Sequence, residues 1–119
     1  MATGLRIPEK VVQQQIVQAL TSVGGRVWVL GTRRPRGDYQ GTRQTPGLPD
    51  LIAFLPPQKW LRRTLLFVEV KAAKGRLRPE QRHFQELCAF ADVEHIVGGL
   101  DAVLAWLARE GYIQPSHPS

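Results

Sequence analysis

Residues 46–55 read P-G-L-P-D-L-I-A-F-L, and residues 64–71 read T-L-L-F-V-E-V-K. Each stretch contains a short apolar run bounded by turn residues or charges, which is typical of a covered β-strand. The two prolines that follow the first run end it, because proline cannot continue a ladder of backbone hydrogen bonds. The connection between the runs is short, so we predict that strands at 50–55 and 64–70 pair antiparallel.

Three charged residues accompany these strands. Glu69 and Lys71 share one face of the second strand, because side chains alternate between the two faces of a sheet. Asp50 opens the first strand, and in an antiparallel pair the start of one strand lies beside the end of the other. Asp50 and Glu69 are therefore expected to converge. The simpler alternative is an ordinary Glu69–Lys71 ion pair at the edge of the sheet.

Two facing carboxylates repel each other unless a proton or a cation lies between them. Carboxylate and carbonyl oxygens suit a hard divalent cation that keeps part of its water shell. We therefore predict a site for Mg²⁺ or Mn²⁺, as one or two ions. Its expected ligands are Asp50, Glu69 and the backbone carbonyl of Val70.

The flanking segments predict the other elements. Val12, Ile16 and Leu20 follow a helical period between residues 8 and 23, and R-V-W-V-L at 26–30 has the pattern of a strand. A second helix is expected to begin at Pro79, followed by a strand at 94–97 and a last helix from residue 100. The order α-β-β-β-α-β-α predicts an α/β fold with a mixed four-stranded sheet flanked by helices. We expect a single domain over 1–119, with a frayed tail at about 112–119.

Polar residues lie near the starts of two predicted helices. Glu9 and Gln13 fall within the apolar stripe of the first helix, and Gln81 lies on the core-facing side of the second. Helix N-termini can face the same end of a sheet and present their dipoles to an anion. The alternatives are that Glu9 only stabilises a helix N-terminus and that the two amides are satisfied buried groups.

The charge balance favours a polyanionic partner. Sixteen Lys and Arg against ten Asp and Glu give a net charge of +6, and basic charge favours nucleic acid through counterion release. The basic residues cluster on both sides of the two strands, although two solvated loops would look the same. The candidate DNA-backbone contacts are Arg33, Arg34, Arg36, Arg43, Lys74 and Arg76.

Cysteine content and hydropathy exclude several classes. Cys88 is the only cysteine, which excludes an internal disulfide and a Cys-rich zinc site. No apolar run approaches the roughly 20 residues that cross a bilayer, and the N-terminus lacks the apolar core of a signal peptide. We expect an intracellular protein without a membrane partner.

The motifs, taken in order, resemble the VRR-NUC family of the PD-(D/E)xK nuclease superfamily. They are an E-x3-Q pair at Glu9 and Gln13, a G-x-P-D motif at Gly47, Pro49 and Asp50, an E-x-K motif at 69–71, and G-R-L-R-P-E-Q at 75–81. The sequence departs from the family at Arg78, where a helix-capping serine is common. Arginine has no acceptor for the first amides of a helix.

The resemblance implies a restriction-endonuclease-like core and a metal-dependent DNA endonuclease. Short members of the family are similar to Holliday junction resolvases that act as dimers on four-way DNA. The residues expected to be catalytic are Glu9, Asp50, Glu69, Lys71 and Gln81. Glu9 is a further expected metal ligand, and Gln13, Gly47 and Pro49 are expected to support the site.

Several alternatives remain open within and beyond this resemblance. A nickase or a flap nuclease would carry the same fold and motifs. A DNA-binding module without catalysis, or an interaction protein that grips an acidic partner, would share the basic loops. For a dimer, the candidate surfaces are Trp60, Trp106 and the C-terminal helix, with Trp106 alternatively in the core.

Overall fold

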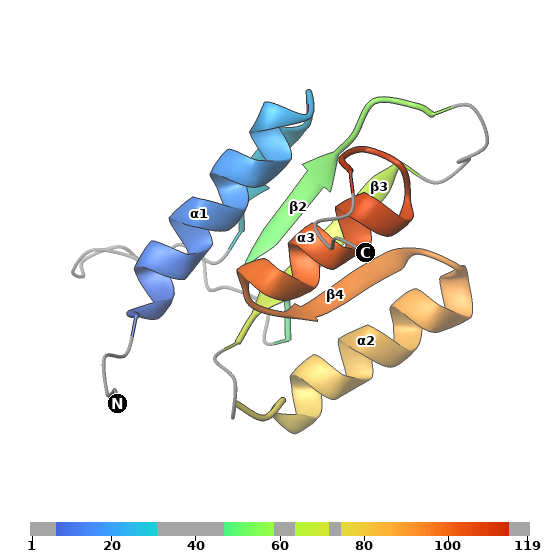
Figure 1. The fold of residues 1–119 in the computed structure, drawn as a ribbon. Helices are drawn as coiled ribbons and strands as arrows, with labels where there is room; N and C mark the ends of the chain where they lie inside the picture. Colours follow the sequence, from blue (N-terminus) through green and yellow to red (C-terminus); the bar gives the residue numbers. More distant parts are fainter. Residues whose placement is uncertain (1–6, 31–46, 59–63, 72–74, 115–119) are drawn as a thin grey trace, which may run out of the picture.

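The computed structural model describes residues 7–30, 47–58, 64–71 and 75–114. Its elements follow the predicted order, and the predicted α/β fold is confirmed (Figure 1). They are helix α1 (Glu9–Ser22), strands β1 (Arg26–Val29), β2 (Leu51–Phe54) and β3 (Leu65–Val70), helix α2 (Pro79–Ala91), strand β4 (Glu94–Gly98) and helix α3 (Leu100–Arg109).

The four strands form one mixed sheet in the order β1-β2-β3-β4. β2 pairs antiparallel with both β1 and β3, as the short connection predicted for β2 and β3, and Leu51 lies opposite Val68. β4 pairs parallel with β3. A parallel pair needs a crossover connection, and α2 provides it.

One face of the sheet carries the main hydrophobic core. Leu51, Leu66 and Val68 point from β2 and β3 to this face and are fully buried. They pack with buried residues of α1 and α3, among them Ile16 and Leu107. α1 and α3 therefore cover this face side by side (Figure 1). The apolar stripe predicted for the first helix is the one that the core buries.

The opposite face is covered by α2 only along β4 and part of β3. The Phe84 ring packs edge-on against Phe67 at a centroid distance of 5.1 Å and lies 5.8 Å from the ring of His95. A helical period through Phe84, Leu87 and Cys88 would bury Leu87 as well, but Leu87 is 48% exposed. α2 contacts mainly one strand, β4, so its covered stripe is narrow.

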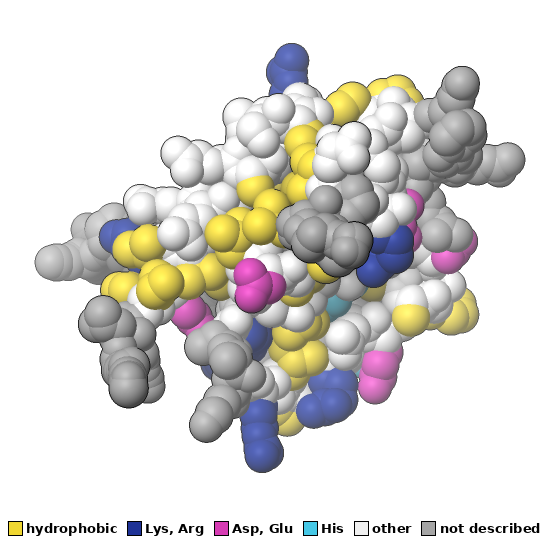
Figure 2. All heavy atoms as spheres, viewed as in Figure 1, with side chains coloured by type: hydrophobic (Ala, Val, Ile, Leu, Met, Phe, Trp, Pro, Cys, Tyr) yellow, Lys and Arg dark blue, Asp and Glu magenta, His cyan; other side chains and the backbone are white. Residues whose placement is uncertain are grey.

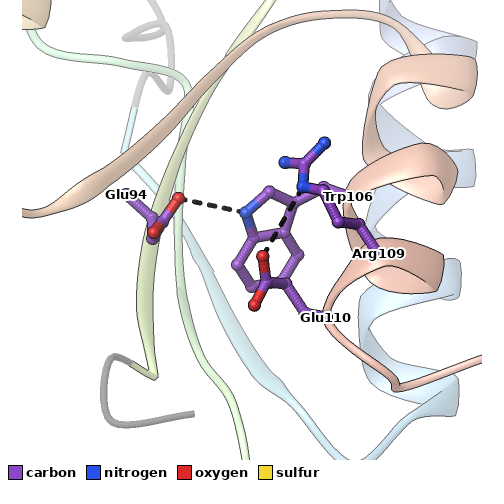
Figure 3. Close-up of polar contacts among 4 residues, drawn as sticks. All are labelled: Glu94, Trp106, Arg109 and Glu110. Atoms are coloured by element: carbon purple, nitrogen blue, oxygen red, sulfur yellow. Dashed lines mark hydrogen bonds and ion pairs between the residues drawn. The ribbon is translucent and has the colours of Figure 1, made fainter.

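Trp106 lies in the core and is not an exposed contact surface. Its side chain is only 3% exposed, and its indole N–H donates to Glu94 Oε1 at 3.1 Å (Figure 3). The Trp106 ring stacks on Tyr112 at a centroid distance of 6.0 Å. The core alternative for Trp106 is therefore correct, and Trp60 lies outside the described residues.

The chain is also held together just beyond α3. Tyr112, where the sequence predicted the start of a frayed tail, donates its hydroxyl to the carbonyl of Pro56 at 2.7 Å. Close by, Arg109 Nε and Glu110 Oε2 form an ion pair of 3.6 Å (Figure 3).

Within the part of the chain that the structure describes, no helix combines the length and apolarity needed to span a bilayer.

Candidate active site

The candidate residues come from elements that meet at one end of the sheet. The first turn of α1, the start of β2, the end of β3 and the start of α2 all lie at this end (Figure 1). The antiparallel pairing of β2 with β3 brings the residues before β2 beside the residues at the end of β3. Sequence positions that are far apart thus supply one site.

Asp50 is held beside the end of β3 by three hydrogen bonds. Its backbone N–H donates to Val68 O at 3.1 Å, and its carbonyl accepts from the N–H of Leu30 at 2.7 Å. Its side-chain Oδ2 accepts from the backbone N–H of Val70 at 2.8 Å. These contacts place the Asp50 carboxylate next to the backbone that carries Glu69, as the strand pairing predicted.

The turn before Asp50 packs directly on the first turn of α2. Gly47 has φ +94°, and a Cβ added there would lie 2.6 Å from the carbonyl oxygen of Glu80. Both facts require glycine. Any other residue would be strained at this positive φ, and its Cβ would clash with the Glu80 carbonyl. Pro49 is fully buried. Gly47 and Pro49 therefore fix the position of Asp50 relative to α2.

Glu69 is a buried carboxyl with a raised pKa. Its side chain is only 4% exposed. The pKa rises from 4.5 to about 7, first because burial disfavours the charged form and second because of the charge of Asp50 and a hydrogen bond with its side chain. The positive charge of Lys71 acts in the opposite direction, and Glu9 adds the smallest upward contribution. The Asp50–Glu69 pair thus favours one shared proton when no cation is bound.

Gln81 links this carboxyl to the start of α2. Its Nε2 donates to Glu69 Oε2 at 3.0 Å, and its Oε1 accepts from the backbone N–H of Arg78 at 2.8 Å. The second bond is one half of a capping box, and the Arg78 guanidinium has no acceptor with which to complete the other half. Because Oε1 is engaged by Arg78, the amide presents its NH₂ group to Glu69.

The sequence placed Gln81 on the core-facing side of its helix, and in the structure the partner of its NH₂ group is Glu69. A signal for its orientation was present in the sequence. A glutamine at the third position of a helix that begins at Pro79 is at the capping-box position.

Glu9, Gln13 and Lys71 are the remaining candidates among the described residues. Glu9 opens α1 and is exposed, and Gln13 is half-buried one turn later. Lys71 is half-buried, and its backbone N–H donates to Gly98 O at 2.9 Å, which anchors the chain just after β3. Glu9 and Lys71 are both near enough to influence the pKa of Glu69.

The donor set fits a hydrated divalent cation. Among the described residues, no group of three or more His, Cys, Asp or Glu side chains is placed to hold a metal. Two carboxylates, Asp50 and Glu69, do converge, and Mg²⁺ is commonly held by one or two carboxylates with waters and substrate phosphate as the other ligands. A cation between them would replace the shared proton and relieve their repulsion.

Exposed basic side chains lie near the start of α2, the helix that carries Gln81. Lys and Arg side chains gather at the end of the molecule where α2 begins (Figure 2). Arg76 and Arg78 are exposed there. The other candidate DNA contacts, which are Arg33, Arg34, Arg36, Arg43 and Lys74, lie outside the described residues.

Comparisons with known proteins identify the family of this domain. The model of the VRR-NUC domain family matches residues 4–98. A solved structure described as a VRR_NUC domain superposes with a TM-score of 0.62 and 28% sequence identity, covering 88% of this chain and 97% of the solved chain. No curated protein matches the chain. The family match spans most of the chain and includes every candidate catalytic residue, and the chain therefore belongs to the VRR-NUC family of nuclease-type domains.

Proposed function

We propose that the protein is a divalent-metal-dependent endonuclease that hydrolyses phosphodiester bonds in DNA. The observation that carries this proposal is the buried Glu69 carboxyl, which lies against Asp50 and is held by Gln81. Two facing carboxylates destabilise a folded chain unless a cation or a proton lies between them. The presence of such a pair in a nuclease-type domain therefore favours metal binding. The net charge of +6 favours DNA as the substrate.

In this mechanism Asp50, Glu69 and the Val70 carbonyl would hold the cation, and Glu9 would contribute directly or through water. The bound cation would supply Lewis-acid chemistry toward the phosphate and lower the pKa of the attacking water. Gln81 fixes the orientation of the Glu69 carboxylate, and Gln13 positions Glu9. The two anchored turns before Asp50 and after β3 keep the carboxylates in place.

Lys71 lies where charge develops during the reaction. Water attacks phosphorus in line with the leaving 3′ oxygen, the P–O3′ bond breaks, and the 3′ oxygen takes up a proton. The products are a 5′-phosphate and a 3′-hydroxyl. The Lys71 ammonium orients the water and stabilises the negative charge on the phosphoryl oxygens. Arg76 and the other basic residues contact the DNA backbone, which positions the substrate without reading bases.

Cleavage of supercoiled plasmid with Mn²⁺ or Mg²⁺ tests this function. We expect Asp50→Asn, Glu69→Gln and Lys71→Ala each to lower the cleavage rate by about a hundredfold or more, while DNA binding survives. EDTA should abolish cleavage, and added Mn²⁺ should restore it. A matched control is Glu86→Gln, which makes the same charge change at an exposed residue of α2.

Normal turnover by purified Glu69→Gln protein, or cleavage that persists in EDTA, would contradict the proposal. DNA binding without cleavage by the wild-type protein under all metal conditions would point instead to a non-catalytic DNA-binding module.

For the substrate we propose branched DNA, with the four-way junction first, cut by a homodimer. A two-fold dimer presents two equivalent sites, which matches the two symmetry-related scissile phosphates of a four-way junction. Matched duplex, flap and four-way substrates, cleaved in parallel with a measurement of solution mass, decide between these substrates. A monomeric mass together with equal rates on all three substrates would contradict this part of the proposal.

A further inference from the structure

An exposed aromatic pair lies on β1 and β2, outside the site described above. Trp28 is 64% exposed and Phe54 is 44% exposed. Their rings meet edge-on, with centroids 6.0 Å apart and an interplanar angle of 71°. This geometry is favourable for aromatic pairs and leaves much of both rings accessible. Two adjacent exposed rings present a continuous aromatic surface on which a flat ligand can stack.

The strand register places this pair on the same face of the sheet as the catalytic carboxylates. Asp50, Ile52 and Phe54 alternate with the core residues of β2, so their side chains share the opposite face. Trp28 lies directly across from Ile52. Trp28 and Phe54 thus belong to the face from which Asp50 approaches Glu69.

The distance between the two features is short. Trp28 pairs with Ile52 across β1 and β2, and Asp50 precedes Ile52 by two residues along the chain of β2. Two residues of a strand span about 6.8 Å and neighbouring strands lie about 4.8 Å apart, so Trp28 lies about 8 Å from the position of Asp50, which is comparable with the size of one nucleotide. A nucleotide next to the one held at the carboxylates would therefore reach the Trp28 ring.

A basic residue lies beside the aromatic pair, and no described helix packs on it. Arg26 is exposed, lies opposite Phe54 in the register and shares a face with Trp28. Helix α2 covers this face only near β4, at the opposite edge of the sheet from β1. No described helix therefore covers Trp28 and Phe54 (Figure 1). An aromatic surface beside a cation is the combination that binds single-stranded nucleic acid, through base stacking and phosphate contact.

A second copy of the chain suits this patch less well than DNA does. The exposed parts of two such rings amount to on the order of 250 Å², whereas a stable interface buries about 800 Å² per partner. The patch also adjoins the proposed DNA site and carries an exposed arginine.

We infer that Trp28 and Phe54 form a stacking platform for an unpaired nucleobase next to the scissile phosphate, with Arg26 contacting the adjoining phosphate. The inference rests on the proposed nuclease function and deepens it. In a fully paired duplex the bases are already stacked and are not free to bind. The platform therefore favours DNA with unpaired bases near the cut.

Binding of labelled oligothymidylate and of labelled duplex, measured by fluorescence anisotropy without metal, tests the platform apart from catalysis. Trp28→Leu keeps an apolar side chain against Ile52 but removes the aromatic ring, and it should weaken oligothymidylate binding at least tenfold. Its duplex binding should change less than twofold. Trp28→Phe keeps a ring and should retain most of the affinity. Phe90→Leu, at an exposed aromatic residue near the end of α2, is the matched control.

Equal oligothymidylate binding by wild type, Trp28→Leu and Phe54→Leu would overturn the inference, and Glu69→Gln would still test the nuclease function separately. A dimeric wild type that becomes monomeric in Trp28→Leu would also overturn it, because the patch would then join two copies. If no DNA is cleaved but Trp28→Leu still loses single-strand binding, the platform is supported and only the nuclease proposal fails. Thermal unfolding followed by circular dichroism confirms that each variant is folded.

Discussion

The Glu69 carboxyl is enclosed by Asp50, Gln81 and the end of β3. Burial and the neighbouring carboxylate both disfavour its charged form, so the proposed metal site is also a source of instability in the metal-free protein. The pKa of about 7 means that the folded state holds this proton at a pH where the unfolded chain, with a value of 4.5, has lost it. The stabilising contribution of the protonated group is therefore complete below about pH 4.5 and is lost as the pH rises through 7.

This argument predicts that Glu69→Gln stabilises the metal-free protein at high pH. Glutamine keeps an oxygen that accepts from Gln81 Nε2 but carries no charge. At pH 8 the free energy of unfolding in urea should rise by about 1–3 kcal/mol relative to wild type. The gain should disappear at pH 4 in EDTA, where Glu69 is protonated. A variant that is less stable than wild type at pH 8 would contradict the account of Glu69.

At the scale of elements, the contact between the 47–50 turn and α2 joins the start of β2 to the helix that carries Gln81. Gly47 makes this contact possible, because its backbone lies against that of Glu80. The periodic patterns that predicted α1, β2, β3 and α3 are local features of the chain, and for that reason their order could be predicted from the sequence. The sequence did not show how much of α2 would be covered, because this depends on its packing against β4 and part of β3.

Gly47→Ala tests the coupling between this turn and α2. The substitution adds both backbone strain at φ +94° and a contact of 2.6 Å with the Glu80 carbonyl. We expect a loss of about 2–5 kcal/mol in the free energy of unfolding and a lower cleavage rate in the protein that remains folded.

Gly111→Ala is the control for Gly47→Ala. It has a similar φ of +86° and no atom within 4 Å of the added Cβ. It should lose only about 1–2 kcal/mol and keep its cleavage rate. Equal losses in the two variants would show that the contact with Glu80 is unimportant.

At the scale of the whole molecule, the distribution of charge matters as well as its sum. The net charge of +6 attracts DNA from a distance, and basic side chains gather at the end of the molecule where α2 begins (Figure 2). Arg76 is exposed near this end of the sheet, while Arg109 is exposed at the end of α3 and pairs with Glu110.

Arg76→Glu and Arg109→Glu make the same change in net charge at these two places. Duplex binding, measured by anisotropy between 50 and 200 mM salt, should weaken about tenfold in Arg76→Glu, with a shallower salt dependence. Arg109→Glu should weaken binding less than threefold. Equal effects would mean that only the overall charge steers DNA.

The sequence by itself determined the order of elements, the mixed α/β fold and the approach of Asp50 to the end of β3. These follow from local periods and from one short antiparallel connection, both of which are written in neighbouring residues. The motif order also indicated the family, which the family match confirmed. The sequence alone did not predict which residues surround each side chain in the folded protein.

Only the tertiary structure decided that Gln81 binds Glu69, that Trp106 is in the core and that Trp28 and Phe54 stay exposed. The partner of Gln81 depends on how the start of α2 docks against the end of β3. The other two outcomes depend on which face of the sheet each helix covers. Burial is set by contacts between segments that are distant in the chain, and no local pattern of residue types contains that information.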